Sequence, residues 1–146
     1  MRNAVLSVAI TTILASAPLA PVWADGHRTA APDGAQVYIV SPADGSTVSG
    51  PVTVVFGLAG MGVAPAGVEK ENTGHHHLLI GVDPSTVDME NALPADDQHV
   101  HFGGGQTQAT VELAPGEHTL VLLLGDQNHI PHDPPIVSDP VTITVE

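Results

Sequence analysis

The stretch QTQATVELAPGEHTLVLLLG, residues 106–125, carries the strongest signals for the fold. Short apolar and β-branched runs lie on both sides of the Pro115-Gly116 pair, and neither run places its apolar residues at helical spacing. Proline and glycine favour the fixed and positive φ values that tight turns require. The stretch therefore predicts two strands, residues 106–113 and 119–125, joined as a hairpin.

Runs of the same kind recur outward from this stretch, separated by clusters of Gly, Pro and Asp. They lie at residues 37–41, 52–58, 76–82 and 141–145, with a weaker run at 98–102. Short strands at such intervals, seven in all, are typical of a β-sandwich. We therefore predict an all-β, immunoglobulin- or fibronectin-like antiparallel sandwich of about seven strands.

The N-terminal part of the chain has the pattern of an export signal. Residues 1–24 predict a signal peptide, because Arg2 precedes a short apolar run and Val22-Trp23-Ala24 has the small-x-small pattern of a cleavage site. Residues 25–36 are small and polar and predict a flexible leader, and residues 37–146 predict one domain. We expect a periplasmic protein whose mature chain has no membrane span.

Composition restricts the partners and the sources of stability. The 146 residues contain 16 acidic and 3 basic side chains, for a formal net charge of −13, which argues against nucleic acid because phosphate binding needs Lys and Arg. The chain has no cysteine, so an exported domain must be stabilised by its core or by a metal ion. A metal ion and another periplasmic protein are the expected partners.

The histidines are the main functional signal. Most of the nine lie in three groups: His75-His76-His77, His99 with His101, and His129 with His132. A His-x-His pair on a strand places both imidazoles on one face, about 6.5–7 Å apart, so that both can reach one ion. The predicted ligands are His75, His77, His99, His101, His129 and His132, of which four or fewer would bind one ion, with Asp126 orienting an imidazole. Imidazole ligands without thiolate favour Cu(II) or Zn(II), with Ni(II) as a further candidate.

Two details of this prediction stay open. Either His75 and His77 point to a site on the outer face of their strand, or His76 lies at the rim of the core. In addition, cleavage after Ala24 would leave Asp25-Gly26-His27 as a free N-terminus, a sequence that suits square-planar Cu(II) or Ni(II). His118, which stands alone, is expected to be a surface or hydrogen-bonded residue.

Four motifs resemble one known family. They are GHHHLL at residues 74–79, HFGGGQT at 101–107, PGEHTL at 115–120, and the segment 125–134 with its two histidines and its prolines. Together they resemble the bacterial domain-of-unknown-function family 4399, over residues 37–145. The resemblance implies a small exported β domain, and it implies no activity because the family has none assigned.

These observations predict an exported domain that binds or handles copper or zinc at a His-rich end of a β-sandwich, without enzymatic turnover. Three alternatives remain. The first is a structural or protein-interaction module whose histidines form a hydrogen-bond network without metal. The second is a small metalloenzyme with an open coordination position, and the third is a pH sensor built on clustered imidazoles.

Overall fold

The computed structural model describes residues 28–146. The predicted signal peptide and the Asp25-Gly26-His27 motif lie outside the described residues. The strands are β1 (Gln36–Ser41), β2 (Thr47–Val48), β3 (Val52–Ala59), β4 (Gly62–Val63), β5 (Thr73–Ile80), β6 (His99–His101), β7 (Gln108–Val111), β8 (Gly116–Gly125) and β9 (Val141–Val145), with a short 3₁₀ turn, η1 (Pro84–Thr86).

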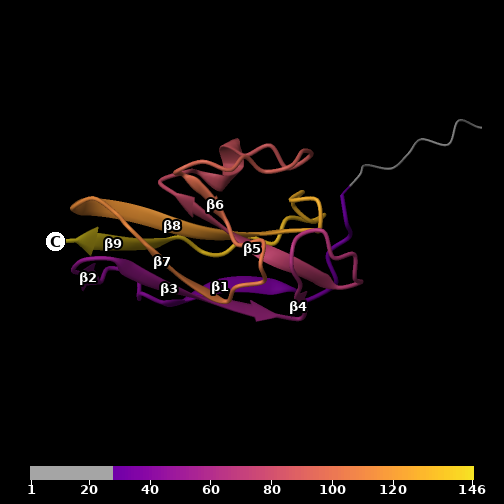
Figure 1. Cartoon of the computed structure of the whole chain (residues 1–146), viewed down its shortest axis with the longest axis horizontal. Helices are drawn as coiled ribbons and strands as arrows, with labels where there is room; N and C mark the ends of the chain where they lie inside the picture. Colours follow the sequence, from indigo (N-terminus) through magenta and orange to yellow (C-terminus); the bar gives the residue numbers. More distant parts are fainter. Residues whose placement is uncertain (1–27) are drawn as a thin grey trace, which may run out of the picture.

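Two sheets stack face to face (Figure 1). One has the order β1-β3-β7, and the other has the order β2-β9-β8-β5-β4 with β6 also paired to β5. The long strands pair antiparallel, whereas the two-residue strands β2 and β4 pair in parallel. The predicted all-β antiparallel sandwich is confirmed, and each of the seven predicted runs contains a strand.

The predicted hairpin between residues 106–113 and 119–125 is wrong. β7 pairs with β3 in one sheet, while β8 pairs with β5 and β9 in the other, so the turn at Pro115 carries the chain from sheet to sheet. The cause is the apolar run 120–124, in which each residue is at most 2% exposed. A strand buried on both faces is most stable at the centre of a sheet, and that position leaves no free edge for β7.

The core has two parts because β8 is covered on both faces. Between the sheets, Leu78, Leu120, Leu122 and Leu124 pack against Val54 and their neighbours. On the outer face, Leu79, Val121 and Leu123 pack against Leu93, which belongs to the connection between β5 and β6. Full burial of each such side chain contributes about 1.5–3 kcal/mol.

Residues 25–36 are predicted to be a flexible leader, and the structure describes them from Arg28 onward. There the segment is hydrogen-bonded to residues 131–133, and Ala30 forms a parallel bridge with Asp133. Although its composition is typical of a leader, its backbone groups find partners on the loop that follows β8.

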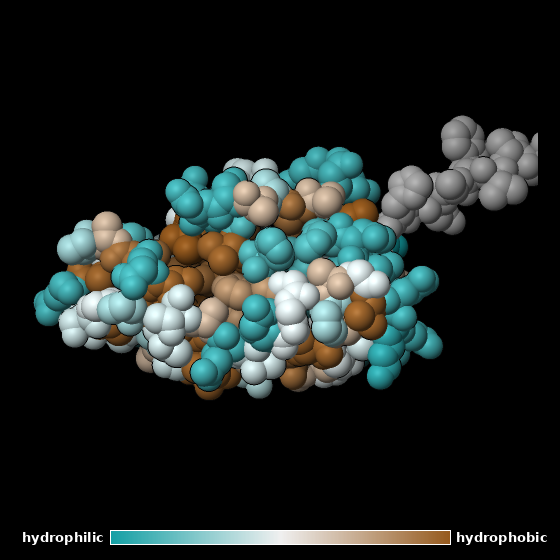
Figure 2. Space-filling view, in the orientation of Figure 1, coloured by the Kyte–Doolittle hydropathy of each residue, from teal (hydrophilic) through white to brown (hydrophobic). Residues whose placement is uncertain are grey.

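The outer surface is mixed. In Figure 2 apolar residues gather in the hollow between the two layers near β7, and hydrophilic residues cover much of the remaining face. Within residues 28–146, the structure contains no helix that is long and apolar enough to cross a membrane.

Candidate metal centre

Strand β5 distributes its three consecutive histidines over two faces. His76 packs between the sheets, where its ring lies 5.0 Å from that of Phe56, whereas His75 and His77 share the opposite face. This alternation follows from the two-residue period of a strand. Both open alternatives therefore apply, because His75 and His77 form an outer group and His76 borders the core.

Two further histidines join the outer group from other segments. His101 lies directly opposite His77 in the pairing of β5 with β6. His129 lies in the loop that follows β8, and its ring meets those of His75 and His77 edge-on, with centroid distances of 4.8 and 5.7 Å. The cluster is thus assembled from residues up to 54 positions apart in the sequence.

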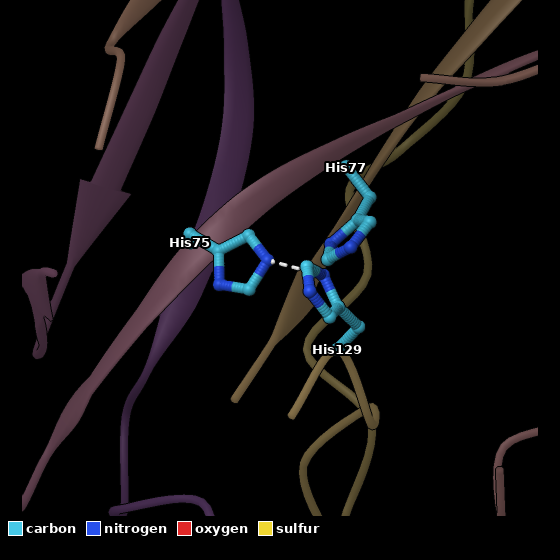
Figure 3. A group of neighbouring side chains, drawn as sticks. All are labelled: His75, His77 and His129. Carbon is cyan, nitrogen blue, oxygen red and sulfur yellow. Dashed lines mark hydrogen bonds between the residues drawn. The ribbon is translucent and has the colours of Figure 1, made fainter. Parts of the chain in front are cut away.

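The geometry of the cluster suits one ion (Figure 3). One ring nitrogen from each of His75, His77 and His129 lies within 4.8 Å of the others. The Nε2 atom of His75 and the Nδ1 atom of His129 are hydrogen-bonded at 3.0 Å, so one of them carries the proton in the absence of metal.

His101 completes a set of four rings. Its centroid lies 5.2 Å from that of His129 and 6.2 Å from that of His77. Tetrahedral coordination with metal–nitrogen bonds of about 2 Å would place ring centroids roughly 5 Å apart. The 5.2 Å distance matches that spacing, and the 6.2 Å distance exceeds it.

Burial leaves the cluster with unpartnered nitrogens. The side chains of His75 and His77 are at most 1% exposed. The Nδ1 atom of His75 and both ring nitrogens of His77 have no hydrogen-bond partner among residues 28–146. A buried polar atom without a partner costs about 1–3 kcal/mol, and His77 could offset part of that cost by binding a ligand through one of its two ring nitrogens.

Electrostatics keep these rings neutral. Burial, together with the nearby His129 and His101, lowers the pKa of His75 to about 4. Burial, together with His75 and His129, lowers the pKa of His77 to about 3, and burial also lowers the pKa of His129. Neutral imidazoles have free lone pairs at neutral pH, which metal binding requires.

The loop that carries His129 is tightly held. His129 has φ = 65°, a left-handed conformation that costs a non-glycine residue about 1 kcal/mol or more. The buried Asp126 carboxylate accepts hydrogen bonds from the backbone N–H groups of Asn128 and Ile130, at 2.8 and 3.1 Å. Asp126 therefore holds the backbone of the loop that carries His129, and its role in orienting a metal-binding imidazole stays a prediction.

The segment that begins at Arg28 also holds the loop after β8 in place. The Thr29 hydroxyl donates to the second oxygen of the Asp126 carboxylate at 2.8 Å. The Arg28 guanidinium donates to the carbonyls of Pro131 and His132 and lies 3.4 Å from the Asp133 carboxylate. Sequence reasoning missed both residues, because it treated this segment as a leader.

The long connection between β3 and β5 contacts both histidine-bearing turns. The Ala66 N–H donates to the Gly103 carbonyl, two residues after His101, and the Gly67 N–H donates to the Gln127 carbonyl, two residues before His129. Each bond is 2.9 Å long. The connection therefore links the two turns into one structural unit.

A glycine opposite His75 makes room for the cluster. A Cβ atom on Gly125 would lie 2.5 Å from Cε1 and 3.0 Å from Nδ1 of His77. No side chain larger than hydrogen fits there unless the His77 ring moves. Sequence reasoning did not identify Gly125, although its position at the end of the leucine run was visible.

Two of the six predicted ligands lie elsewhere. The His99 ring is hydrogen-bonded to the Asp96 carboxylate, with 2.8 Å between Nδ1 and Oδ1. The His132 ring is fully buried, with Nδ1 at 3.4 Å from the Leu124 carbonyl and Cε1 beside Gly74. The structure thus brings together His75, His77, His101 and His129. His118, as expected, is hydrogen-bonded, to the Ala114 carbonyl at 2.7 Å.

Comparison with known families gives one assignment. Residues 54–146 match the family described as "Domain of unknown function (DUF4399)". The chain belongs to the DUF4399 family. The matched residues contain all four clustered histidines, whereas Arg28 and Thr29 lie before the DUF4399 match. Comparison with curated proteins gives no match.

One similar solved structure is that of the Clostridium thermocellum CbhA fibronectin(III)-like modules. The similarity covers 75% of this chain and 93% of that chain, with a TM-score of 0.40 and 9% sequence identity.

Proposed function

We propose that this DUF4399 protein binds a divalent transition-metal ion, Cu(II) or Zn(II), and handles it in the periplasm without catalytic turnover. His75, His77 and His129 are the buried ligands, and His101 is the fourth. The observation that carries the proposal is the convergence of one ring nitrogen from each of His75, His77 and His129 within 4.8 Å, with both nitrogens of the buried His77 unpartnered among the described residues.

The donor set supports the choice of metal. The cluster offers neutral imidazoles, and the nearby Asp126 carboxylate is occupied by hydrogen bonds to the loop and to Thr29. Imidazole suits Zn(II) and Cu(II), whereas Ca(II) and Mg(II) prefer oxygen ligands. Together with the formal net charge of −13, which attracts cations, this favours a transition metal.

A purely structural histidine network fits the cluster less well. Such a network needs each buried imidazole to donate or accept, and His77 does neither among residues 28–146. The hydrogen bond between His75 and His129 involves one ring nitrogen of each residue. It provides no partner for either nitrogen of His77.

The export part of the proposal is supported by the sequence pattern of residues 1–24. Its test is the mass of the mature protein recovered from the periplasmic fraction. A first residue at Asp25 is expected, and recovery of the full chain from the cytoplasm would contradict it.

Thermal unfolding with and without added metal tests the binding function. A ligand that binds the folded chain stabilises it by about 2.7 kcal/mol when its free concentration is 100 times Kd. Untagged wild-type protein should therefore melt several degrees higher with Zn(II) or Cu(II), while Ca(II) leaves the melting temperature unchanged. The H77L variant should show no such rise. A wild-type protein that gains no stability from either metal would overturn the proposal.

A further inference from the structure

We infer that His101 is an exchangeable ligand on the solvent side of the cluster, and that an imidazole donor takes its place when metal is passed on. The inference rests on the proposed function and adds to it the route and the chemical class of the acceptor. It is drawn from the unequal exposure of the four rings and from the way β6 is anchored.

The exposure of the four histidines increases from the buried side of the cluster to its solvent side. His75 and His77 are at most 1% exposed and His129 is half-buried, whereas His101 is exposed. An incoming ligand from solvent can reach the ion on the His101 side without displacing a buried ring. The buried rings would hold the ion while that one position changes its donor.

The backbone beside His101 is fixed, so once the metal–nitrogen bond has broken, the side chain can rotate away without movement of β6. Phe102 is buried, its ring lies 4.8 Å from that of Phe56, and its N–H donates to the His76 carbonyl at 2.9 Å. Rotation of an exposed side chain takes picoseconds to nanoseconds, which is far faster than opening of a loop. His101 can thus leave and return while β6 stays in place.

A glycine turn, residues 103–105, follows His101. A Cβ atom on Gly103 would lie 3.3 Å from both Cδ2 of His101 and Cβ of Ala66, so this glycine lets the ring and Ala66 pack closely. Gly104 is exposed, so the solvent side of the turn has no side chain at that residue. An imidazole-sized ligand would approach His101 from this exposed side.

The exchange step is balanced without any co-reactant. The metal–nitrogen bond to His101 breaks, a metal–nitrogen bond to the incoming neutral imidazole forms, and the charge of the ion stays unchanged. The acceptor is a free imidazole ligand or a histidine side chain of another protein. The remaining three bonds are then replaced one after another as the ion leaves.

Chemical rescue of the copper-loaded, untagged chain tests the inference. The H101A variant should bind Cu(II) with an altered electron paramagnetic resonance spectrum, and millimolar imidazole should restore the wild-type spectrum. Release of copper to a chelator should be at least about tenfold faster in H101A than in wild type and should slow when imidazole is present. A histidine-containing peptide distinguishes the two sources, because rescue by the peptide requires a position open to a protein side chain.

Two matched variants sharpen this experiment. H99A removes the other histidine of β6, which is held by Asp96, and should behave as wild type. H77A removes a buried ligand and should not be rescued by imidazole, because its position is closed to solvent.

Two results would overturn the inference while the proposed function stands. One is an H101A spectrum and release rate identical to wild type, which would leave three ligands only. The other is an H101A variant that retains its fold but binds no copper even with imidazole, which would make His101 an integral ligand. A wild-type chain that binds no copper would instead refute the proposed function itself.

Discussion

The two faces of β5 bury histidines in different ways. On the inner face His76 lies against Phe56, and its Nδ1 atom meets the Gln106 carbonyl at 3.2 Å. On the outer face His75 and His77 turn toward each other, with ring centroids 4.6 Å apart, and His129 and His101 approach the same space. The same residue type on the same strand thus packs in the core on one face and forms the candidate metal centre on the other.

This contrast shows that burial alone does not mark a metal site. His76 is as buried as His75, and burial lowers the pKa of both. What distinguishes the outer face is the convergence of several neutral nitrogens on one point, which a core histidine lacks.

The largest effect is expected from replacing one histidine on each face. H77L should weaken Zn(II) or Cu(II) binding by more than about 100-fold, because it removes a buried ligand, whereas H76L should change the affinity by less than about threefold. Isothermal titration of the untagged variants measures both. Equal losses in the two variants would mean that the faces are not distinct.

The same H77L variant should be more stable than wild type when both are free of metal. It replaces two unpartnered buried nitrogens with an apolar group, which is expected to stabilise the fold by about 1–3 kcal/mol. Urea unfolding in the presence of a chelator measures this gain. A destabilised H77L would show that His77 makes favourable contacts without metal.

The metal-free protein should lose stability as the pH falls, because the folded chain keeps the outer-face histidines His75 and His77 neutral. The pKa values of His75 and His77 are lowered from 6.5 to about 4 and about 3 in the folded chain. Below pH 6.5 the unfolded chain therefore binds more protons on these residues than the folded chain does. The stability is complete above pH 6.5 and declines as the pH falls toward 4. Between pH 7.5 and 5, H77L should decline less steeply than wild type, and parallel curves would contradict this assignment.

A smaller effect is expected from filling the space opposite His75. G125A places a Cβ atom 2.5 Å from the His77 ring and should weaken metal binding by about tenfold through displacement of that ring. G62A is the matched control, because its Cβ atom would meet its nearest neighbour at 3.4 Å, an ordinary contact. Competition with a metal-binding dye compares the two, and equal affinities would show that His77 tolerates the displacement.

The smallest effect should come from the N-terminal segment. T29V keeps the shape of the side chain but removes its hydrogen bond to Asp126, which loosens the His129 loop by about 1 kcal/mol, or threefold to tenfold in metal affinity. Because this hydrogen bond is already present without metal, the melting temperature of the metal-free protein should also fall, by an amount that corresponds to about 1 kcal/mol. The same dye competition and a thermal scan measure the two effects.

The sequence predicted the sandwich because its strands are short and clearly separated. It also predicted that His75 and His77 share a face, since that follows from strand spacing alone. It could not assign the strands to sheets, because the burial of β8 on both faces depends on Leu93 and the connection between β5 and β6.

Convergence of the site was only partly predictable for a similar reason. His99 and His101 have the spacing of a ligand pair. However, Asp96 forms a backbone bridge with His99, and its carboxylate is hydrogen-bonded to the His99 ring. The burial of His132 beside Gly74 depends on how the loop after β8 folds back. The contacts of Arg28 and Thr29 likewise arise only when distant segments meet.

X-ray absorption at the zinc edge of the zinc-loaded, untagged protein tests the central claim most directly. The account predicts one ion per chain surrounded by three or four imidazole nitrogens at about 2.0 Å, and loss of this signal in H77L. A shell of oxygen atoms, or the same imidazole shell in H77L, would contradict it.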